Sequence, residues 1–520
     1  MRTFLFFLLA GCATTPPASP PRVEAPPPVT PPTPPPPATA SLPEVAPLTV
    51  VSLPTTPSPI VSLRLVFRAG SVDDPSGKEG LTALTTRLLF EGGTASRTAA
   101  EFTRALYPMA AELRTDTDKE FTTVAGRVHR ERFEVFLPLL LEALLTPRFE
   151  PKEFERLKAE QLTTLRTRLR NENDEELGKV MLDAVLFDGH PYRHAVVGTE
   201  AGLEAITLGD VRAQWARLFT QDRLVIGTAG GATEADAKTL ATRLSALPAK
   251  GPPRVVIPRP PARPKETLVI RRDTASTAGS FGFAWPIRRE HPDFAALFLG
   301  VSFLGEHRQE HGVLFRELRD KRGLNYGTYA YAEHFRQDGW EPLPRPGVRR
   351  SVEDFSLWLR PVEARNGPFA TRALLFFLDQ TLRQPLPPGR FETAKGFLLG
   401  ALRQWTLTDQ RRLGWAIDEV LTGTLGHVER LAKRLETLTP AEVQRALVTH
   451  LDPAQLSFVF VTRDAEGLIS AFTSGAAAPA TYPTPKPPDV LETDGRVERF
   501  PIPMERSRTR IIEASEVLAR

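Results

Sequence analysis

One stretch of the sequence has the residue types and the spacing of a metal-dependent hydrolytic site. His307, Glu310 and His311 form the pattern H-x-x-E-H, in which two imidazoles can bind zinc and a carboxylate can activate a bound water molecule. Two histidines four residues apart share a metal only when they lie on one face of a helix. Gly305 and Gly312 flank the pattern and favour a loop instead. We therefore predict a structural or substrate-facing loop, and keep a zinc site as the alternative.

A second set of chemically suited residues lies just downstream, in the segment LRDKRGLNY of residues 318–326. The guanidinium of Arg319 and the phenol of Tyr326 are both hydrogen-bond donors, and donors directed at a carbonyl oxygen stabilise the oxyanion that develops during peptide hydrolysis. Gly323 is expected to end the helix that carries Arg319 and to turn the chain into the strand that carries Tyr326. The alternative is structural: Arg319 would be a solvated helix residue and Tyr326 an aromatic side chain packed in a strand.

The elements that must position these residues are predicted from hydrophobic periodicity. Residues 60–67 alternate as a strand, and residues 81–90 carry apolar side chains at helical spacing. Two further helices are predicted over residues 133–145 and 151–169, and a closing strand over 223–227. This mixture predicts an α+β unit.

The same unit occurs a second time further along the chain. Matching positions recur at a nearly constant offset: Phe154-Glu155 and Phe391-Glu392, Leu177-Gly178 and Leu413-Gly414, and Asp183 and Asp418. A period this long indicates domain duplication, and 520 residues exceed the ~250 to 300 that a single core supports. We expect two homologous domains, each a mixed or antiparallel sheet flanked by helices, over residues 48–247 and 266–473. A proline-rich linker over 248–265 would join them, and a C-terminal tail over 474–520 would follow.

The N-terminus carries the features of an export signal followed by a spacer. A short apolar run ends in Leu-Ala-Gly-Cys, where Cys12 is the single cysteine of the chain. This stretch resembles a bacterial lipoprotein box, so residues 1–11 would be removed as a signal peptide and Cys12 would be lipidated. Residues 12–47 are rich in proline and almost uncharged, which predicts an extended tether. We expect the protein in the bacterial cell envelope, lipid-anchored to a membrane, the outer membrane being favoured, with its domains in the periplasm or at the cell surface.

The composition argues against several classes of function. The 66 Lys and Arg residues nearly balance the 62 Asp and Glu residues, and no long basic run occurs, so no nucleic-acid partner is expected. A single cysteine excludes an internal disulfide framework and a zinc cluster of thiolates. The apolar run at the N-terminus is far shorter than the ~20 residues that a membrane-spanning helix requires.

From about residue 48 onward the sequence resembles the pitrilysin/insulinase (inverzincin) family of metallopeptidases, particularly its mitochondrial-processing-peptidase-like bacterial members. Three features carry the resemblance: the stretch of residues 70–92, the segment 318–326, and the duplication. The resemblance implies a duplicated insulinase-like α+β fold, in which pairs of domains close around an unfolded peptide. It also implies that Arg319 and Tyr326 hold the substrate carbonyl in the active site of a zinc-bearing domain.

The zinc motif of that family is missing from the expected helix, residues 81–91. Aligned on the flanking sequence, its two histidines fall on Ala83 and Arg87, and its glutamate falls on Thr86. The distal glutamate ligand falls within residues 161–171, which contain no acidic residue. Alanine and threonine do not replace a neutral imidazole, and an arginine repels a metal cation. We therefore expect no catalytic residue and no bound cofactor in this chain.

The resemblance and the missing motif together imply a non-catalytic, substrate-binding subunit of a zinc-dependent peptidase. The chain would bind unfolded peptide through Arg319 and Tyr326, while a homologous partner subunit would supply the zinc. It would be inactive alone, as a pseudoenzyme within a heterodimeric metalloendopeptidase. Two alternatives stay open: an active zinc peptidase that uses His307, Glu310 and His311, or a peptide-binding or scaffolding lipoprotein with no role in hydrolysis.

Overall fold

The computed structural model describes the chain over residues 40, 42–260, 265–336 and 343–520. These residues belong to one folded unit. The predicted signal peptide, Cys12 and most of the predicted tether lie outside the described residues. The end of the predicted tether packs on the folded unit: Leu42 is buried, and Arg68 Nη1 donates to the carbonyl of Pro43 at 2.6 Å. No helix within the described ranges is long and apolar enough to span a bilayer.

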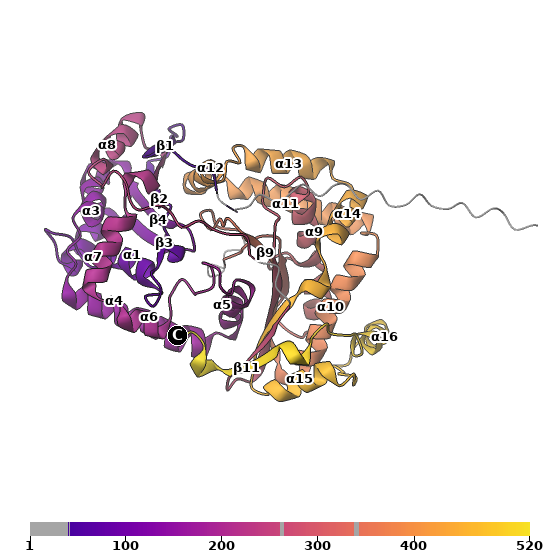
Figure 1. The fold of residues 1–520 in the computed structure, drawn as a ribbon. Helices are drawn as coiled ribbons and strands as arrows, with labels where there is room; N and C mark the ends of the chain where they lie inside the picture. Colours follow the sequence, from indigo (N-terminus) through magenta and orange to yellow (C-terminus); the bar gives the residue numbers. More distant parts are fainter. Residues whose placement is uncertain (1–39, 41, 261–264, 337–342) are drawn as a thin grey trace, which may run out of the picture. The chain divides into compact units, whose positions relative to one another are not determined.

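The first half of the folded unit is built on a five-stranded mixed sheet, in the order β1-β5-β2-β4-β3 (Figure 1). The strands are β1 (Thr49–Ser52), β2 (Ile60–Phe67), β3 (Glu112–Thr117), β4 (Thr122–His129) and β5 (Leu224–Gly230). β1 runs parallel to β5, and all other neighbours are antiparallel. β2 is buried along almost its whole length because it lies in the middle of the sheet. β3 forms one edge.

Helices cover this sheet, and α1 (Leu81–Glu91) is the helix that the sequence identified as the degenerate metal helix. Its apolar positions Leu84, Leu88 and Leu89 are fully buried in the core, which is why the helical spacing was readable. The other helices of this half are α2 (Ala99–Leu106), α3 (Phe133–Leu145), α4 (Pro151–Thr163), α6 (Glu200–Ala205), α7 (Leu208–Leu218) and α8 (Glu234–Leu244). The predicted helix over residues 151–169 is divided: α4 is followed by a π-helix over Thr164–Glu172.

The second half contains a six-stranded mixed sheet, in the order β11-β6-β10-β7-β9-β8. Its strands are β6 (Thr267–Arg271), β7 (Ser276–Trp285), β8 (Thr328–Tyr331), β9 (Glu353–Glu363), β10 (Ser457–Thr462) and β11 (Thr509–Glu513). Its helices are α9 (Phe294–Gly305), α10 (Gly367–Arg383), α11 (Pro388–Trp405), α13 (His427–Thr437), α14 (Pro440–His450), α15 (Ala465–Thr473) and α16 (Pro488–Val497). The predicted fold class, a duplicated α+β fold with two helix-flanked sheets, is confirmed.

Two helices are exchanged between the halves. α5 (Asp174–Leu186) belongs to the first half by sequence but packs on β7, β9 and β10, whereas α12 (Asp409–Thr422) packs on β1, β2 and β5 (Figure 1). Glycine permits the close approach: a Cβ on Gly178 would lie 2.9 Å from Ser280 Oγ. The repeated Leu-Gly pair of the sequence therefore marks the two exchanged helices. Because each sheet is covered by a helix of the other half, neither half has a complete core of its own.

The C-terminal tail joins both halves. β11 extends the second sheet as a parallel edge strand beside β6. The chain then reaches the first half, where Arg170 Nε donates to the carbonyl of Val517 at 2.5 Å and the Glu200 N–H donates to the carbonyl of Leu518 at 2.8 Å. The C-terminus accordingly lies beside α6 (Figure 1).

Candidate functional site

A cavity of about 990 Å³ lies between the two halves. The first half contributes α1, the edge strand β3, the end of α4 with its π-helix, and α5. The second half contributes residues 334–336, Arg350 and β9. Ala83, Thr86 and Arg87 all line this space, so the degenerate metal helix forms one of its walls. The volume is within the range of pockets that bind substrates, ~300 to 1,000 Å³.

Arg87 fills the space between α1 and α4 with paired charges. Its Nε donates to Glu91 Oε1 at 2.9 Å, and its Nη2 donates to Glu160 Oε2 at 2.7 Å. Arg156 Nη1 donates to the other oxygen of Glu160, also at 2.7 Å. The hydrogen bonds from Arg87 and Arg156 lower the pKa of Glu160, so this carboxylate remains ionised and paired.

The side chains on this face of α1 do not fit a zinc ion. The buried hydroxyl of Thr86 donates to the carbonyl of Thr82 at 2.9 Å, and Ala83 has no ligand atom. The guanidinium of Arg87 is a cation held by two carboxylates, where zinc would require neutral imidazole. This wall therefore has the chemistry of an ion-pair network rather than that of a metal centre.

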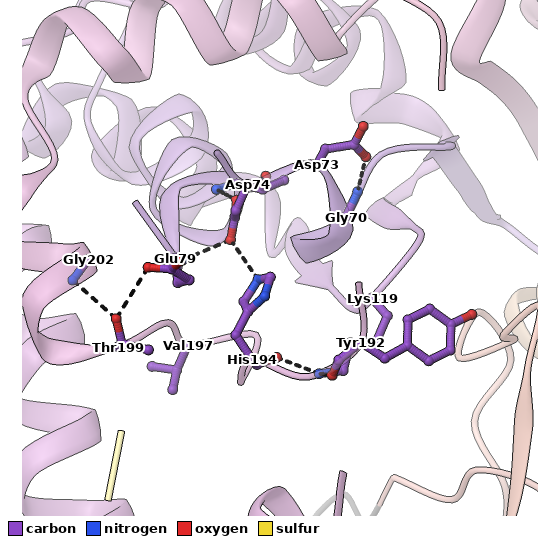
Figure 2. Close-up of polar contacts among 12 residues, drawn as sticks. Gly70, Asp73, Asp74, Glu79, Lys119, Tyr192, His194, Val197, Thr199 and Gly202 are labelled. Carbon is purple, nitrogen blue, oxygen red and sulfur yellow. Dashed lines mark hydrogen bonds and ion pairs between the residues drawn. The ribbon is translucent and has the colours of Figure 1, made fainter. Parts of the chain in front are cut away.

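The loop before α1 is fixed to the segment before α6 (Figure 2). Asp74 accepts from the Thr82 N–H at 2.7 Å, which stabilises the N-terminus of α1. His194 Nε2 lies 3.4 Å from the same carboxylate. Lys119 Nζ donates to the carbonyls of Tyr192 and His194 at 2.6 and 2.5 Å. α1 is thus held firmly in the cavity wall although it carries no metal ligands.

The opposite wall is organised by the buried guanidinium of Arg350. Its Nη1 donates to Asp183 Oδ2 at 3.1 Å, and its Nη2 lies 3.5 Å from Asp118 Oδ1 and 3.0 Å from His334 Nε2. Burial opposes the charged form of Arg350, but Asp183 and Asp118 outweigh it and raise the pKa of Arg350. Burial lowers the pKa of His334 to about 3, so this imidazole is neutral. The network joins the halves across the cavity.

Asp354 on β9 lies beside this network and is 4% exposed. Its Oδ1 has no hydrogen-bond partner among the described residues. Burial and the charge of Asp183 raise the pKa of Asp354 to about 7, although Arg350 opposes the shift. A carboxyl group that titrates near neutral pH in a cavity wall is a candidate functional group.

The edge strand β3 supplies a third wall. Thr115, Asp116 and Thr117 line the cavity, and in the sheet β3 pairs with β4 alone. Within the described part of the chain, no strand pairs with the other edge of β3. An extended peptide can pair with such an edge as an additional strand.

Arg319 is placed outside this cavity. It lies in a π-helix over Phe315–Asp320, not in the α-helix that the sequence predicted. Its Nη1 donates to Asp320 Oδ1 at 3.1 Å, and its guanidinium carbon lies 4.5 Å from the ring centroid of Phe315. Arg319 is not among the described residues that line the cavity.

Tyr326 is likewise remote from the cavity lining and is 81% exposed. It precedes β8, so it is a loop residue rather than the strand residue that was predicted, and its exposure excludes the alternative of a packed aromatic side chain. The structure therefore does not bring Arg319 and Tyr326 to the cavity face of Ala83, Thr86 and Arg87 in the same chain.

The H-x-x-E-H segment forms turns and no helix. His307 Nδ1 hydrogen-bonds with Tyr331 Oη at 2.6 Å, and His311 Nε2 with Ser302 Oγ at 3.2 Å. Burial lowers the pKa of His307 to about 3 and that of His311 to about 4. The two imidazoles have separate partners and Glu310 is exposed, so the structure does not assemble these three side chains into a zinc site.

The opposite wall, around Arg350, was not predicted from the sequence. Asp183 was noticed as a repeat of Asp418, and the structure gives the repeat a meaning: Asp183 pairs with Arg350, and Asp418 lies 3.7 Å from the adjacent Arg349. A repeated aspartate and a pair of consecutive arginines were the available signals. Nothing in the local sequence marks Asp354.

Comparisons with known families agree with this architecture. The model of the family Insulinase (Peptidase family M16) matches residues 49–200, and the model Peptidase M16 inactive domain matches residues 205–340. Together they cover most of the first half and the start of the second.

Individual proteins described as zinc proteases or as a non-peptidase homolog are also similar to this chain. The non-peptidase homolog YmxG of Helicobacter pylori is 24% identical over 410 residues, which is 78% of this chain and 89% of that protein. An uncharacterized zinc protease of Mycobacterium tuberculosis, Rv2782c, is 25% identical over 395 residues, which is 74% of this chain and 83% of that protein.

Solved structures show the same fold. A peptidase M16 inactive domain from Pseudomonas fluorescens superposes with a TM-score of 0.70 at 23% identity, covering 81% of this chain and 98% of that one. A protease from Helicobacter pylori superposes with a TM-score of 0.69 at 17% identity, covering 81% and 99%.

Proposed function

This chain belongs to the insulinase (M16) family of peptidases, and we propose that it is a non-catalytic, substrate-binding subunit that works with a separate zinc-bearing subunit. The observation that carries the proposal is the wall at α1, where the Arg87 guanidinium is paired with Glu91 and Glu160 at the expected position of the metal. A relative described as a non-peptidase homolog supports the same conclusion.

The cavity and its edge strand support a peptide as the bound molecule. β3 lines a space of about 990 Å³ and pairs with β4 alone among the described strands, and neither feature depends on a metal. Main-chain hydrogen bonds to such an edge would hold an unfolded peptide with little dependence on its sequence.

The segment around Arg319 and Tyr326 supports a partner subunit. Hydrogen bonds to the second half fix the loop that contains Tyr326. The buried Arg322 Nε donates to Asp494 Oδ1 at 2.8 Å, and Asn325 Nδ2 donates to the carbonyl of Arg360 at 3.0 Å. Tyr326 stays exposed on this rigid base, and within the described part of the chain its hydroxyl has no hydrogen-bond partner. Rigid, exposed donors are suited to a peptide carbonyl in the active site of another subunit.

We place the complex at a bacterial membrane, with lipid on Cys12 as the anchor and the proline-rich segment as a spacer. This part of the proposal rests on the sequence at the N-terminus. Palmitate labelling in the producing cell, lost on Cys12→Ser, tests it.

The central experiment compares the full chain alone, the zinc-bearing M16 chain of the same organism alone, and their mixture. We expect no zinc and no peptide hydrolysis from this chain alone, and hydrolysis from the mixture. Arg319→Ala and Tyr326→Phe should each lower kcat of the mixture about 100-fold, the usual effect of removing one oxyanion donor. Size-exclusion chromatography should show the same complex for both variants.

Arg383→Ala is the matched control, because Arg383 is an arginine whose side chain is 78% exposed and pairs only locally with Asp379. It should leave kcat unchanged. Chelator-sensitive hydrolysis by this chain alone would overturn the proposal. A mixture that binds peptide without ever hydrolysing it would favour the second candidate, a peptide-binding lipoprotein, which the metal-independent cavity also supports.

A further inference from the structure

We propose that the cavity wall formed by Asp118, Asp183 and Asp354 binds a positively charged group of the peptide, an ammonium or a guanidinium. This inference rests on the proposed function in one respect, that the occupant of the cavity is a peptide. The carboxylates, their unpaired oxygens and the local balance of charge carry it.

The first support is a set of unsatisfied acceptors. Asp354 Oδ1, Asp118 Oδ2 and Gln161 Oε1 are buried and have no hydrogen-bond partner among the described residues, and all three side chains line the cavity. Buried acceptors without donors are costly, so native proteins retain few of them. Among the donors of the described lining residues, Arg350 Nε is the only one that is buried without a hydrogen-bond partner. A group that reaches these three oxygens must therefore supply hydrogen-bond donors.

The second support is a local excess of negative charge. Asp118, Asp183 and Asp354 surround Arg350, and Lys119 Nζ lies 3.8 Å from Asp183. Three carboxylates thus face two cations. The nearby Asp116 does not change the balance, because Arg336 pairs with it at 2.6 Å. Among the described residues, one of these carboxylates therefore has no cation of its own.

The third support is the response of Asp354 to this excess. Burial and the charge of Asp183 raise the pKa of Asp354 to about 7, so near neutral pH the carboxyl group is partly protonated. A bound cation favours the ionised form, so binding should release a proton and strengthen as pH rises through about 7. The titratable or charged groups of the walls and networks around Asp354 include Asp116, Asp118, Lys119, Glu120, Glu176, Lys179, Asp183, Glu333, His334, Arg336, Arg349, Arg350 and Glu353.

The strand that carries Asp354 is shaped for a long basic side chain. Asp354, Ser356 and Trp358 alternate along β9 and all line the cavity, so a carboxylate, a hydroxyl and an indole follow one another on one face. The amine of Lys179 already lies 3.5 Å from the ring centroid of Trp358. This wall therefore shelters one cation of the protein itself, and suits a second one that arrives with the peptide.

Isothermal titration of the full chain tests the proposal with three synthetic peptides of one otherwise neutral sequence. The first is N-acetylated with one central lysine, the second is N-acetylated with norleucine in its place, and the third has the norleucine and a free N-terminus. At pH 8 we expect the lysine peptide to bind about tenfold more tightly than its norleucine match. The preference should shrink at pH 5.5, and titration in buffers of different ionisation enthalpy should show proton release near pH 7. Tight binding of the third peptide would instead identify the N-terminal ammonium as the charged group.

Asp354→Asn should abolish the preference, so that the two N-acetylated peptides bind this variant with the same affinity. Asp273→Asn is the control, because Asp273 has a side chain that is 90% exposed and lies outside the cavity lining. Unfolding curves of both variants verify that they fold. Equal binding of all three peptides, or a preference that survives Asp354→Asn, would overturn this subsite and leave the proposed function intact. Failure of every peptide to bind would remove both, since the cavity would then hold no peptide.

Discussion

The two charged walls of the cavity differ in how completely their charges are paired. On the α1 wall, Arg87 and Arg156 meet Glu91 and Glu160 in direct hydrogen bonds, and the Arg87 side chain is 28% exposed. On the opposite wall the buried Asp118 and Asp354 and the partly buried Asp183 meet Arg350 and Lys119, and Asp354 keeps an unpaired oxygen. The wall at the expected position of the metal is a closed network of ion pairs. The opposite wall, which no motif marks, is the one for which we propose binding.

The largest effect should come from restoring ligands to the closed wall. Ala83→His with Arg87→His places two imidazoles four residues apart on α1 and frees Glu160 Oε2, which in the wild type accepts from the Arg87 guanidinium at 2.7 Å, while Arg156 still binds Oε1. We expect zinc binding with a micromolar Kd, about 8 kcal/mol, read from the absorption of bound cobalt and from zinc competition. Arg87→His alone is the control. Absence of a cobalt spectrum would mean that α1 has lost its geometry as well as its ligands.

The second largest effect, a loss in the free energy of unfolding, should come from removing the central cation of the open wall. Arg350→Met leaves the buried Asp118 and the partly buried Asp183 without their guanidinium, and breaking a largely buried ion network in this way costs about 3 to 5 kcal/mol. Urea unfolding measures the loss, with the exposed Arg383→Met for comparison. A loss below about 1 kcal/mol would show that water, and not Arg350, stabilises these carboxylates.

Asp354→Asn should stabilise the protein at alkaline pH. The folded-state pKa of Asp354 is raised to about 7, so its contribution to stability is fully present below about pH 4 and is lost as pH rises through 7. The asparagine variant does not titrate, so its advantage in the free energy of unfolding should grow over this window to about 4 kcal/mol at pH 8. Thermal unfolding at pH 4, 6 and 8 follows the trend. A constant difference between the two proteins would contradict it.

The smallest effect is expected for Arg87→Ala. A half-exposed ion pair contributes at most about 1 kcal/mol, and salt screens it. A double-mutant cycle with Glu160→Ala, repeated in 1 M salt, isolates the pair. A coupling energy of about 3 to 5 kcal/mol, as large as the loss expected for Arg350→Met, would contradict the difference between the two walls.

Much of the fold was readable from the sequence because it depends on local periodicity. The strand over 60–67, the helix over 81–91 and the duplication all follow from apolar spacing and repeated positions, and the structure has them at those places. The π-helix over Thr164–Glu172 was not predicted, since widening of a helix depends on its packing and not on any residue type found there.

The candidate site was only half predictable. The degenerate positions Ala83, Thr86 and Arg87 lie in one sequence motif, so they could be named in advance. The acidic wall is assembled from Asp118, Asp183 and Asp354, which are remote in sequence and meet only because α5 crosses to the second sheet. Exposure of Tyr326 was equally unreadable, because aromatic residues near strands are usually packed.

The exchange of α5 and α12 has a consequence for how the protein can be taken apart. A protease that cuts between residues 248 and 265 would release no free domain, because each fragment would still hold a helix embedded in the other. If the two halves were produced as separate polypeptides, each would have a sheet that lacks one of its covering helices. Each would also have one helix, α5 or α12, that packs only on the sheet of the other polypeptide. The two fragments would therefore behave as a split protein. Their reassembly would rebuild the cavity between the halves and could report on the association of the two halves.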